Sequence, residues 1–163
     1  MKDKTMAIES YNVVIEGPDN TGKTTLANYI LKNHADMEYV KVNAVTSYNE
    51  GKNQNYGLLY DLNHKNGVIY DRFIFGEAVY GPILRNYYPS YIHYINQQLP
   101  GNTLLIYLTA DIQTLYDRFD NKFILKEHIP LIHAQYERDF LYQKYPIKCS
   151  TEEIYNVIKE VCS

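Results

Sequence analysis

The stretch Gly17-Pro18-Asp19-Asn20-Thr21-Gly22-Lys23-Thr24 decides the fold of this chain. It matches the pattern G-x-x-x-x-G-K-[ST] at every fixed position. Just before it, residues 11–15 form a short segment with β-branched side chains, which predicts a buried strand. After it, Leu26, Ile30 and Leu31 recur at the spacing of a helix. A strand, a glycine turn and a helix start form a cradle for phosphate, because the backbone N–H groups and the helix N-terminus attract an anion.

The loop therefore predicts a nucleotide site. In this pattern the lysine reaches the β- and γ-phosphates and the hydroxyl that follows it binds Mg²⁺. We expect Lys23 to serve ATP and Thr24 to be a ligand of Mg²⁺. The residues expected to hold the nucleotide are Gly17, Asn20, Thr21, Gly22, Lys23, Thr24 and Thr25. The alternative is a glycine turn with an exposed lysine, and the flanking strand and helix argue against it.

The composition limits the class of protein. A length of 163 residues predicts one domain over 1–163, and 45% hydrophobic with 21% charged residues is ordinary for a globular chain. A net charge of −3 argues against a nucleic-acid partner bound through a broad basic face. Cys149 and Cys162 are too few for a disulfide framework. The chain shows neither an apolar leader nor a run of ~20 apolar residues, so we expect no membrane contact and a cytoplasmic location.

Strand and helix patterns alternate along the chain. Strands are predicted at 11–15, 38–42, 68–70, 103–108 and 146–149. Helices are predicted at 24–31, 56–65, 77–86 (kinked at 81–82), 89–98, 112–119 (capped by Asp111), 126–144 and from 151 onward, with 46–55 as a loop. The last helix places Ile154, Val157, Ile158 and Val161 on one face. This alternation predicts an α/β fold with a five-stranded parallel sheet and helices on both faces, in three layers.

Asp71-Arg72 is the second candidate site, at the end of the predicted strand 68–70. Ligands of parallel α/β sheets bind at the carboxyl ends of the strands, where the glycine loop also lies. The Asp71 carboxylate can hold Mg²⁺ or orient a nucleophile, and the Arg72 guanidinium can grip a second phosphate in a bidentate manner. A surface ion pair is the alternative.

Cations recur further along the chain, at Arg118, Lys122 and Lys126. A basic segment that closes on a reacting phosphate is a recurrent device in phosphoryl transfer, and a solvated helix face is the alternative. No Asn-Lys-x-Asp motif for reading guanine is present. The five histidines show no metal-binding spacing.

Two motifs resemble the thymidylate kinases. The segment from Glu16 to Leu26 is similar to their phosphate loop, with its leading E-G and an acidic residue two places on. Asp71-Arg72-Phe73, followed by Ala78-Val79-Tyr80, resembles their D-R-[YFH]…A-x-Y segment. The resemblance implies a three-layer P-loop kinase fold. It also implies a transferase that moves the ATP γ-phosphate to a deoxynucleoside monophosphate such as dTMP, a step of deoxynucleotide biosynthesis.

The resemblance also assigns roles. Asp19 would accept a hydrogen bond from the sugar 3′-hydroxyl, Arg72 would bind the acceptor phosphate, and Asp71 would act near the metal. Tyr80 would pack against the deoxyribose and exclude a 2′-hydroxyl. Some members carry an arginine where this chain has Asn20, which makes Arg118 the expected catalytic cation of a lid over about 117–127.

The chain also departs from the family. The R-E-P-G-G segment has no counterpart, and the chain is shorter than ordinary members. Glu77 stands where a base-reading residue is common, and it could face a nucleobase or solvent. Tyr56 and Tyr60 are candidates for stacking on the base. A homodimer is also considered.

Two other functions remain open. A deoxynucleoside kinase would phosphorylate a nucleoside 5′-hydroxyl and needs a general base, which relatives often carry as Glu or Asp at the end of the second strand. Asn43 stands near that strand end, which favours the monophosphate acceptor. A non-enzymatic nucleotide-binding switch is the other alternative, and the chain lacks the motifs of switch proteins.

Overall fold

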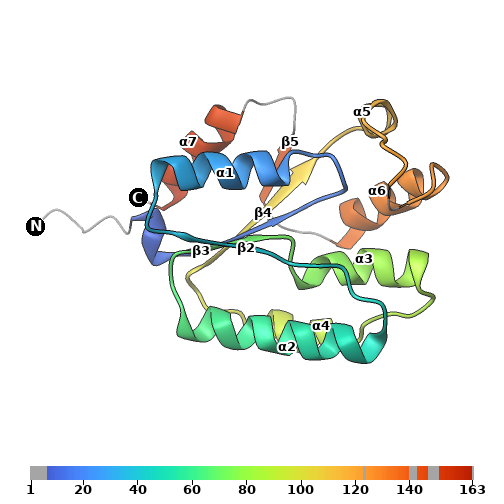
Figure 1. Ribbon diagram of the computed structural model, residues 1–163, viewed down its shortest axis with the longest axis horizontal. Coiled ribbons are helices and arrows are strands. Elements are labelled where there is room, and N and C mark those ends of the chain that lie inside the picture. Colours follow the sequence, from blue (N-terminus) through green and yellow to red (C-terminus); the bar gives the residue numbers. More distant parts are fainter. Residues whose placement is uncertain (1–6, 123, 140–142, 147–150, 163) are drawn as a thin grey trace, which may run out of the picture.

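The computed structural model describes residues 7–122, 124–139, 143–146 and 151–162. The elements in chain order are η1 (Ile8–Ser10), β1 (Asn12–Glu16), α1 (Lys23–Asn33), β2 (Glu38–Lys41), α2 (Tyr48–His64), β3 (Val68–Asp71), α3 (Ile74–Leu84), α4 (Tyr91–Gln97), β4 (Thr103–Thr109), α5 (Ile112–Asp117), α6 (His128–Asp139), β5 (Gln143–Pro146) and α7 (Thr151–Val161). The strands pair in parallel in the order β2-β3-β1-β4-β5 (Figure 1). The predicted α/β fold, with a parallel sheet flanked by helices, is confirmed.

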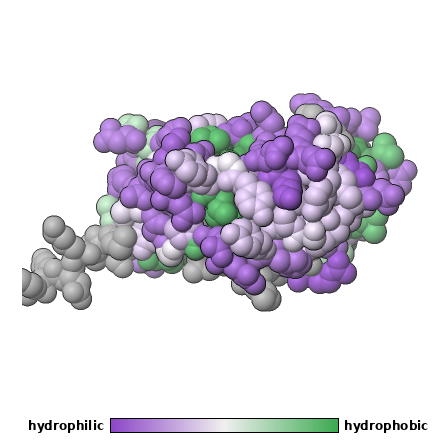
Figure 2. Space-filling view, turned by 90° about the horizontal axis from the view of Figure 1, so that it is seen from below, coloured by the Kyte–Doolittle hydropathy of each residue, from purple (hydrophilic) through white to green (hydrophobic). Residues whose placement is uncertain are grey.

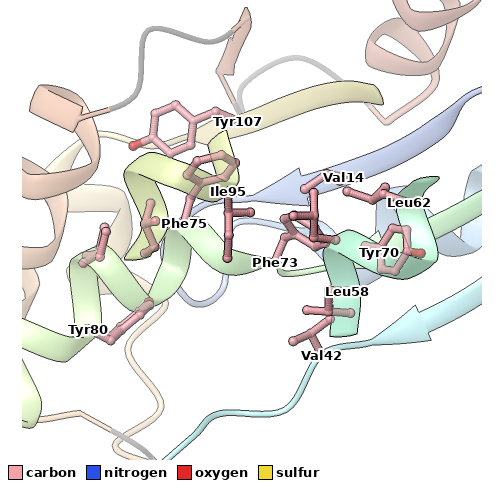
Figure 3. Close-up of a cluster of buried hydrophobic side chains, with 14 of the residues drawn as sticks. Val14, Val42, Leu58, Leu62, Tyr70, Phe73, Phe75, Tyr80, Ile95 and Tyr107 are labelled. Carbon is pink, nitrogen blue, oxygen red and sulfur yellow. The ribbon is translucent and has the colours of Figure 1, made fainter. Parts of the chain in front are cut away.

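The central strand β1 supplies both faces of the core. Its alternation sends Val13 and Ile15 to the face covered by α1 and α7, and Val14 to the face covered by α2, α3 and α4 (Figure 1). All three side chains are fully buried. Figure 3 shows the cluster around Val14, in which aromatic rings from β3, β4 and α3 lie together. Burial on both faces is what a central parallel strand requires.

The carboxyl ends of β1, β2 and β3 meet at one rim of the sheet. Ile15 of β1 and Lys41 of β2 are both register partners of Asp71 in β3. The backbone N–H of Arg72 donates to Ile15 O at 2.9 Å, so the turn after β3 is tied to the end of β1. The glycine loop and Asp71-Arg72 therefore share one edge, as predicted.

The predicted loop at 46–55 is wrong over most of its length, because α2 begins at Tyr48. The Ser47 hydroxyl accepts from the Glu50 N–H at 3.2 Å, and the Glu50 carboxylate binds back to the Thr46 N–H at 3.1 Å. Ser47 and Glu50 have the S-x-x-E spacing of a capping box. The polar composition of this stretch is typical of a loop, and for that reason the prediction missed the capping box.

The predicted helix over 126–144 is too long, and the predicted strand at 146–149 lies too late. Helix α6 spans His128–Asp139, and β5 occupies Gln143–Pro146. Residues 143 and 144 have a helical sequence pattern but belong to β5, because this strand pairs in parallel with β4. Pro146 ends this edge strand, where a proline removes no ladder hydrogen bond that the sheet needs. The predicted strand residues Ile147, Lys148 and Cys149 lie outside the described residues.

The last helix forms as predicted, but its buried face is rotated. Ile154 and Ile158 are buried together with Tyr155 and Cys162. Val157 and Val161 are each 42% exposed. The reason is that α7 packs mainly against α1, which covers only part of the predicted stripe.

Two local predictions concern helix ends. The Asp111 carboxylate accepts from the Thr114 N–H at 2.7 Å and caps α5, as predicted. Pro82 lies inside α3, which ends two residues later at Leu84. No helix in the described part of the chain is both long and apolar enough to cross a membrane.

Candidate active site

The loop between β1 and α1 has the backbone geometry of a phosphate cradle. Gly17 has φ +148°, and a Cβ there would lie 2.5 Å from Leu108 O of β4. Gly22, with φ +88°, is the N-cap of α1. Only glycine can adopt the conformation of residue 17 this close to Leu108 O without displacing β4. Gly22 and the first three residues of α1 line the cleft, so the positive end of the helix dipole lies at the site.

Side chains brace this loop from within. The Thr21 hydroxyl is buried and donates to Pro18 O at 2.8 Å. Asn20 adopts a left-handed conformation with φ +64°, which asparagine tolerates better than most residues. The loop is thus held in shape without a ligand.

Lys23 lies folded over its own loop. Its ammonium donates to Gly17 O at 3.0 Å and to Pro18 O at 2.7 Å, and the side chain is buried. Burial, followed by the positive charge of Arg72, lowers the pKa of Lys23 to about 8. A phosphate would replace neutral carbonyl partners with anionic ones and would favour the charged form of this lysine.

Thr24 and Asp71 form the candidate metal site. The Thr24 hydroxyl donates to Asp71 Oδ2 at 2.6 Å, and the Tyr39 hydroxyl donates to the same oxygen at 2.7 Å. Burial and the bond to Asp71 raise the pKa of Tyr39 to about 12. Two hard oxygen donors beside a phosphate loop fit Mg²⁺, which takes few protein ligands and completes its shell with water and phosphate oxygens.

Arg72 and Asp19 form an ion pair across the cleft. Arg72 has φ +71°, a left-handed conformation that non-glycine residues adopt rarely. Its guanidinium also lies 5.8 Å from the centre of the Tyr80 ring. The structure therefore brings together the three residues expected to hold the acceptor's sugar and phosphate.

Arg118 is the predicted lid cation that reaches the loop. Its guanidinium donates to Asn20 O at 3.1 Å. Lys126 instead lies with its ammonium 5.4 Å from the centre of the Tyr116 ring, and Lys122 is exposed outside the residues that line the cleft. Of these three cations, Arg118 alone lines the phosphate cleft among the described residues.

Lys23, Thr24, Asp71, the Arg72–Asp19 pair and Arg118 line one cleft of about 550 Å³. Its wall contains the loop residues Asp19, Asn20, Gly22, Lys23, Thr24 and Thr25, together with Lys41, Asp71, Arg72, Arg118 and Asp120. Sequence reasoning missed Lys41 and Asp120. Lys41 is the last residue of β2, and its position at a strand end was a signal that could have identified it.

Four of the residues predicted to contact the substrate do not line this cleft: Glu77, Tyr56, Tyr60 and Tyr80. Glu77 is buried. Its Oε2 accepts from Arg85 Nη2 at 2.6 Å, and its Oε1 accepts from the Tyr87 hydroxyl. Glu77 therefore does not face solvent. Tyr60 is 63% exposed on α2 and stacks on His64, and Tyr56 lies against Tyr94. The structure brings neither tyrosine to the phosphate cleft.

The sequence matches no protein-family model, and no relative is found among curated proteins. Solved structures do match. The YorR protein of Bacillus subtilis, in complex with phosphorylated GDP, is 21% identical over 92% of this chain and 94% of that chain, with a TM-score of 0.75. The deoxyadenosine kinase of M. mycoides with bound dATP is 16% identical over 93% and 100%, with a TM-score of 0.69.

The thymidylate kinase of Candida albicans is 15% identical over 94% of this chain and 92% of that chain, with a TM-score of 0.66. At these identities the likeness shows the fold, which is that of P-loop nucleoside and nucleotide kinases. Both kinases cover nearly the whole chain with similar scores. Kinase activity, and thymidylate kinase as its kind, stay predictions.

Proposed function

We propose that this protein is a deoxynucleoside monophosphate kinase that transfers the γ-phosphate of ATP to a pyrimidine deoxynucleotide such as dTMP. The observation that carries the proposal is that the phosphate loop and the Arg72–Asp19 pair line the same cleft. Two phosphate-binding devices on one cleft suit a reaction between two phosphorylated molecules. One domain over 1–163, with a lid at about 117–127, would hold both.

The chain's own groups account for the chemistry by position and charge. The loop N–H groups and Lys23 would bind the ATP phosphates, and Arg118 would add charge from the lid side. Arg72 would hold the acceptor phosphate and Asp19 its sugar hydroxyl. Mg²⁺, held through Thr24 and Asp71, would neutralise charge on the donor phosphates. Phosphoryl transfer needs little covalent work beyond this positioning.

Lys41 favours a phosphorylated acceptor over a nucleoside. It stands beside Asp71 in register, at the strand end where a nucleoside kinase would need a carboxylate base. Asp71 is already bonded to Thr24 and Tyr39, and Asp19 is paired with Arg72. A cation at that position attracts an anionic acceptor and does not remove a proton from a hydroxyl.

The panel that tests the proposal contains Mg-ATP with nucleosides and with deoxynucleoside monophosphates, and the products are separated by anion-exchange chromatography. We expect ADP and a nucleoside diphosphate in equal amounts, with pyrimidine monophosphates the best acceptors. Phosphorylation of nucleosides alone would support the deoxynucleoside kinase, which the likeness to deoxyadenosine kinase keeps open. ATP binding with no ADP formed from any acceptor would support a nucleotide-binding switch.

The remaining expectations belong to the same proposal. Glu77, fixed by Arg85 and Tyr87, is the candidate for reading the nucleobase, and no described contact supports Tyr60 in that role. Figure 2 shows the face seen from below Figure 1 as mainly hydrophilic, with hydrophobic residues in small separate areas. A homodimer stays a prediction. So do a cytoplasmic location and the absence of nucleic-acid and membrane partners.

A further inference from the structure

Glu16, the last residue of β1, is a buried carboxylate that the proposed reaction does not use. It is 3% exposed and immediately precedes Gly17 of the phosphate loop. A buried carboxylate is costly unless several donors satisfy it. The partners of Glu16 therefore indicate what it does.

The first partners of Glu16 are backbone groups at the start of α3. Its Oε1 accepts from the Phe73 N–H at 2.7 Å and from the Gly76 N–H at 3.1 Å. Phe73 is the N-cap of α3 and offers no capping side chain of its own. Glu16 thus replaces the missing cap from another strand, because its Oε1 accepts from two of the backbone N–H groups that a helix N-terminus leaves without partners.

The second partner comes from the helix that follows the lid segment. The Tyr136 hydroxyl of α6 donates to Glu16 Oε2 at 3.4 Å. The Tyr136 ring stacks on Tyr107 at 5.3 Å and meets Tyr80 edge-on at 6.2 Å. A Cβ at Gly76 would lie 3.4 Å from Glu16 Oε2 and 3.6 Å from the Tyr136 hydroxyl, which are ordinary contact distances, so the start of α3 packs closely against this pair.

Arg72 is the residue that this arrangement holds in place. It lies between β3 and the helix start that Glu16 caps, in a left-handed conformation with φ +71°. Such a conformation is costly for a non-glycine residue and persists only where the surroundings enforce it. Two hydrogen bonds hold the backbone on either side of the Arg72 Cα. The Arg72 N–H donates to Ile15 O, and the Phe73 N–H donates to the Glu16 carboxylate.

We propose that Glu16 is a positioning residue for the acceptor phosphate: it holds the Arg72 turn against the phosphate loop and ties both to α6. The proposal rests on the proposed function in one respect only, that Arg72 binds the acceptor. The geometric part concerns the folded chain alone and can be measured without any substrate.

The first test is amide exchange followed by NMR on the full chain. In Glu16→Ala the Phe73 and Gly76 amides should exchange at least about tenfold faster than in the parent, because their acceptor is gone. Glu16→Gln keeps an oxygen at Oε1 and should preserve their protection. Tyr136→Phe should also preserve it, because it removes only the donor to Oε2. The Thr114 amide, capped by Asp111, is the internal reference.

The second test is a comparison of steady-state constants. Glu16→Ala should raise the KM for the monophosphate at least about tenfold while the KM for ATP changes little, because a displaced clamp affects one substrate. Glu16→Gln should restore the parent values. Glu16→Asp keeps the charge but shortens the side chain, and it should shift both readouts in the same direction by less. If Glu16→Ala does not fold, Glu16→Asp takes its place as the variant that tests whether Glu16 holds the Arg72 turn.

Unchanged exchange at Phe73 and Gly76 in a folded Glu16→Ala or Glu16→Asp protein would overturn the inference. An equal rise in both KM values would also overturn it, because the effect would then be on the loop as a whole. If the parent phosphorylates no monophosphate, the proposed function fails, while the exchange experiment still decides whether Glu16 holds the turn.

Discussion

Single residues of the cleft are already bonded to the protein before any nucleotide arrives. Lys23 is bound to Gly17 O and Pro18 O, and Arg72 is bound to Asp19. These two groups, which would each meet a phosphate, are thus held near their working positions. Preorganised charge of this kind is usually the largest contribution to phosphoryl transfer.

Lys23→Ala should reduce kcat by about 10²–10³-fold, which corresponds to about 3–4 kcal/mol of lost transition-state stabilisation. The measurement is the rate of ADP formation at saturating substrates. Lys32→Ala changes an exposed lysine of the same helix and should leave the rate at the parent value. A Lys23→Ala protein with parental kcat would show that this ammonium does not serve the reaction.

Arg72→Ala should weaken the affinity for the monophosphate by about 10–100-fold and leave the affinity for ATP unchanged. The reason is that a charge-assisted bidentate contact is lost from one substrate only. Separate calorimetric titrations with dTMP and with an unreactive ATP analogue measure the two affinities. Asp19→Asn, which keeps the shape and removes the ion pair, serves as the comparison. An unchanged affinity for the monophosphate would exclude Arg72 from the acceptor site.

Lys41→Ala should raise the KM of the acceptor by about tenfold, which is the size of one charged hydrogen bond, about 1.4 kcal/mol. Lys65→Ala removes an exposed lysine beyond α2 and provides the matched control. A larger effect on a nucleoside than on its monophosphate would contradict the role of Lys41 in attracting a phosphate.

The sequence was sufficient for residues whose role lies in a local pattern. Gly17, Lys23 and Thr24 stand in a fixed motif, and Arg72 follows a clear strand end. Lys41 was missed because its role depends on the register of β2 against β3, which no local pattern carries. Tyr60 was proposed from its residue type, and the structure places it on the exposed side of α2.

At the scale of elements, prediction failed where tertiary pairing or a cap decided the outcome. Strands near residues 12–16, 68–71 and 103–109 were strongly apolar and were placed within one residue of each observed end. The helix expected to run to residue 144 stops at Asp139, because β5 pairs with β4. The start of α2 was missed because its capping box lies in a polar stretch that resembles a loop.

Ser47→Ala should lower the free energy of unfolding by about 1 kcal/mol, because the Glu50 N–H loses its acceptor at the start of α2. Chemical denaturation followed by circular dichroism measures the change. Asn53→Ala lies on the exposed side of the same helix and should not destabilise the protein, because alanine is the better helix former. Equal losses in both variants would argue against the cap.

At the scale of the whole molecule, most residues that line the cleft lie at or just after the carboxyl ends of β1, β2 and β3, strands that Figure 1 shows side by side. Two buried charged groups with a shifted pKa, Glu16 and Lys23, lie at the same edge of the sheet. Burial raises the pKa of Glu16 to about 7, and the main offsets are its bond from Gly76 and the charge of Lys23. Arg72 and the Tyr136 phenol complete the surroundings of this carboxyl.

This shift predicts a pH dependence of stability. The folded state favours protonated Glu16, because burial raises the pKa of this carboxyl from its ordinary 4.5 to about 7. The contribution is therefore present at low pH and is lost as the pH rises from about 4.5 to about 7. Glu16→Gln lacks this titration, so its Tm relative to the parent should rise across that window and level off above it. Glu38→Gln, at an exposed carboxylate, is the control variant for this comparison.

The Arg72–Asp19 pair also bears on how the protein responds to ionic strength. An acceptor phosphate that takes Arg72 from Asp19 exchanges one ionic contact for another. The number of ion pairs hardly changes, so added salt weakens this step less than it weakens binding to a cation that was free. Lys41 has no side-chain partner among the described residues and represents the second case. The affinity of the acceptor should therefore owe its salt sensitivity mainly to Lys41.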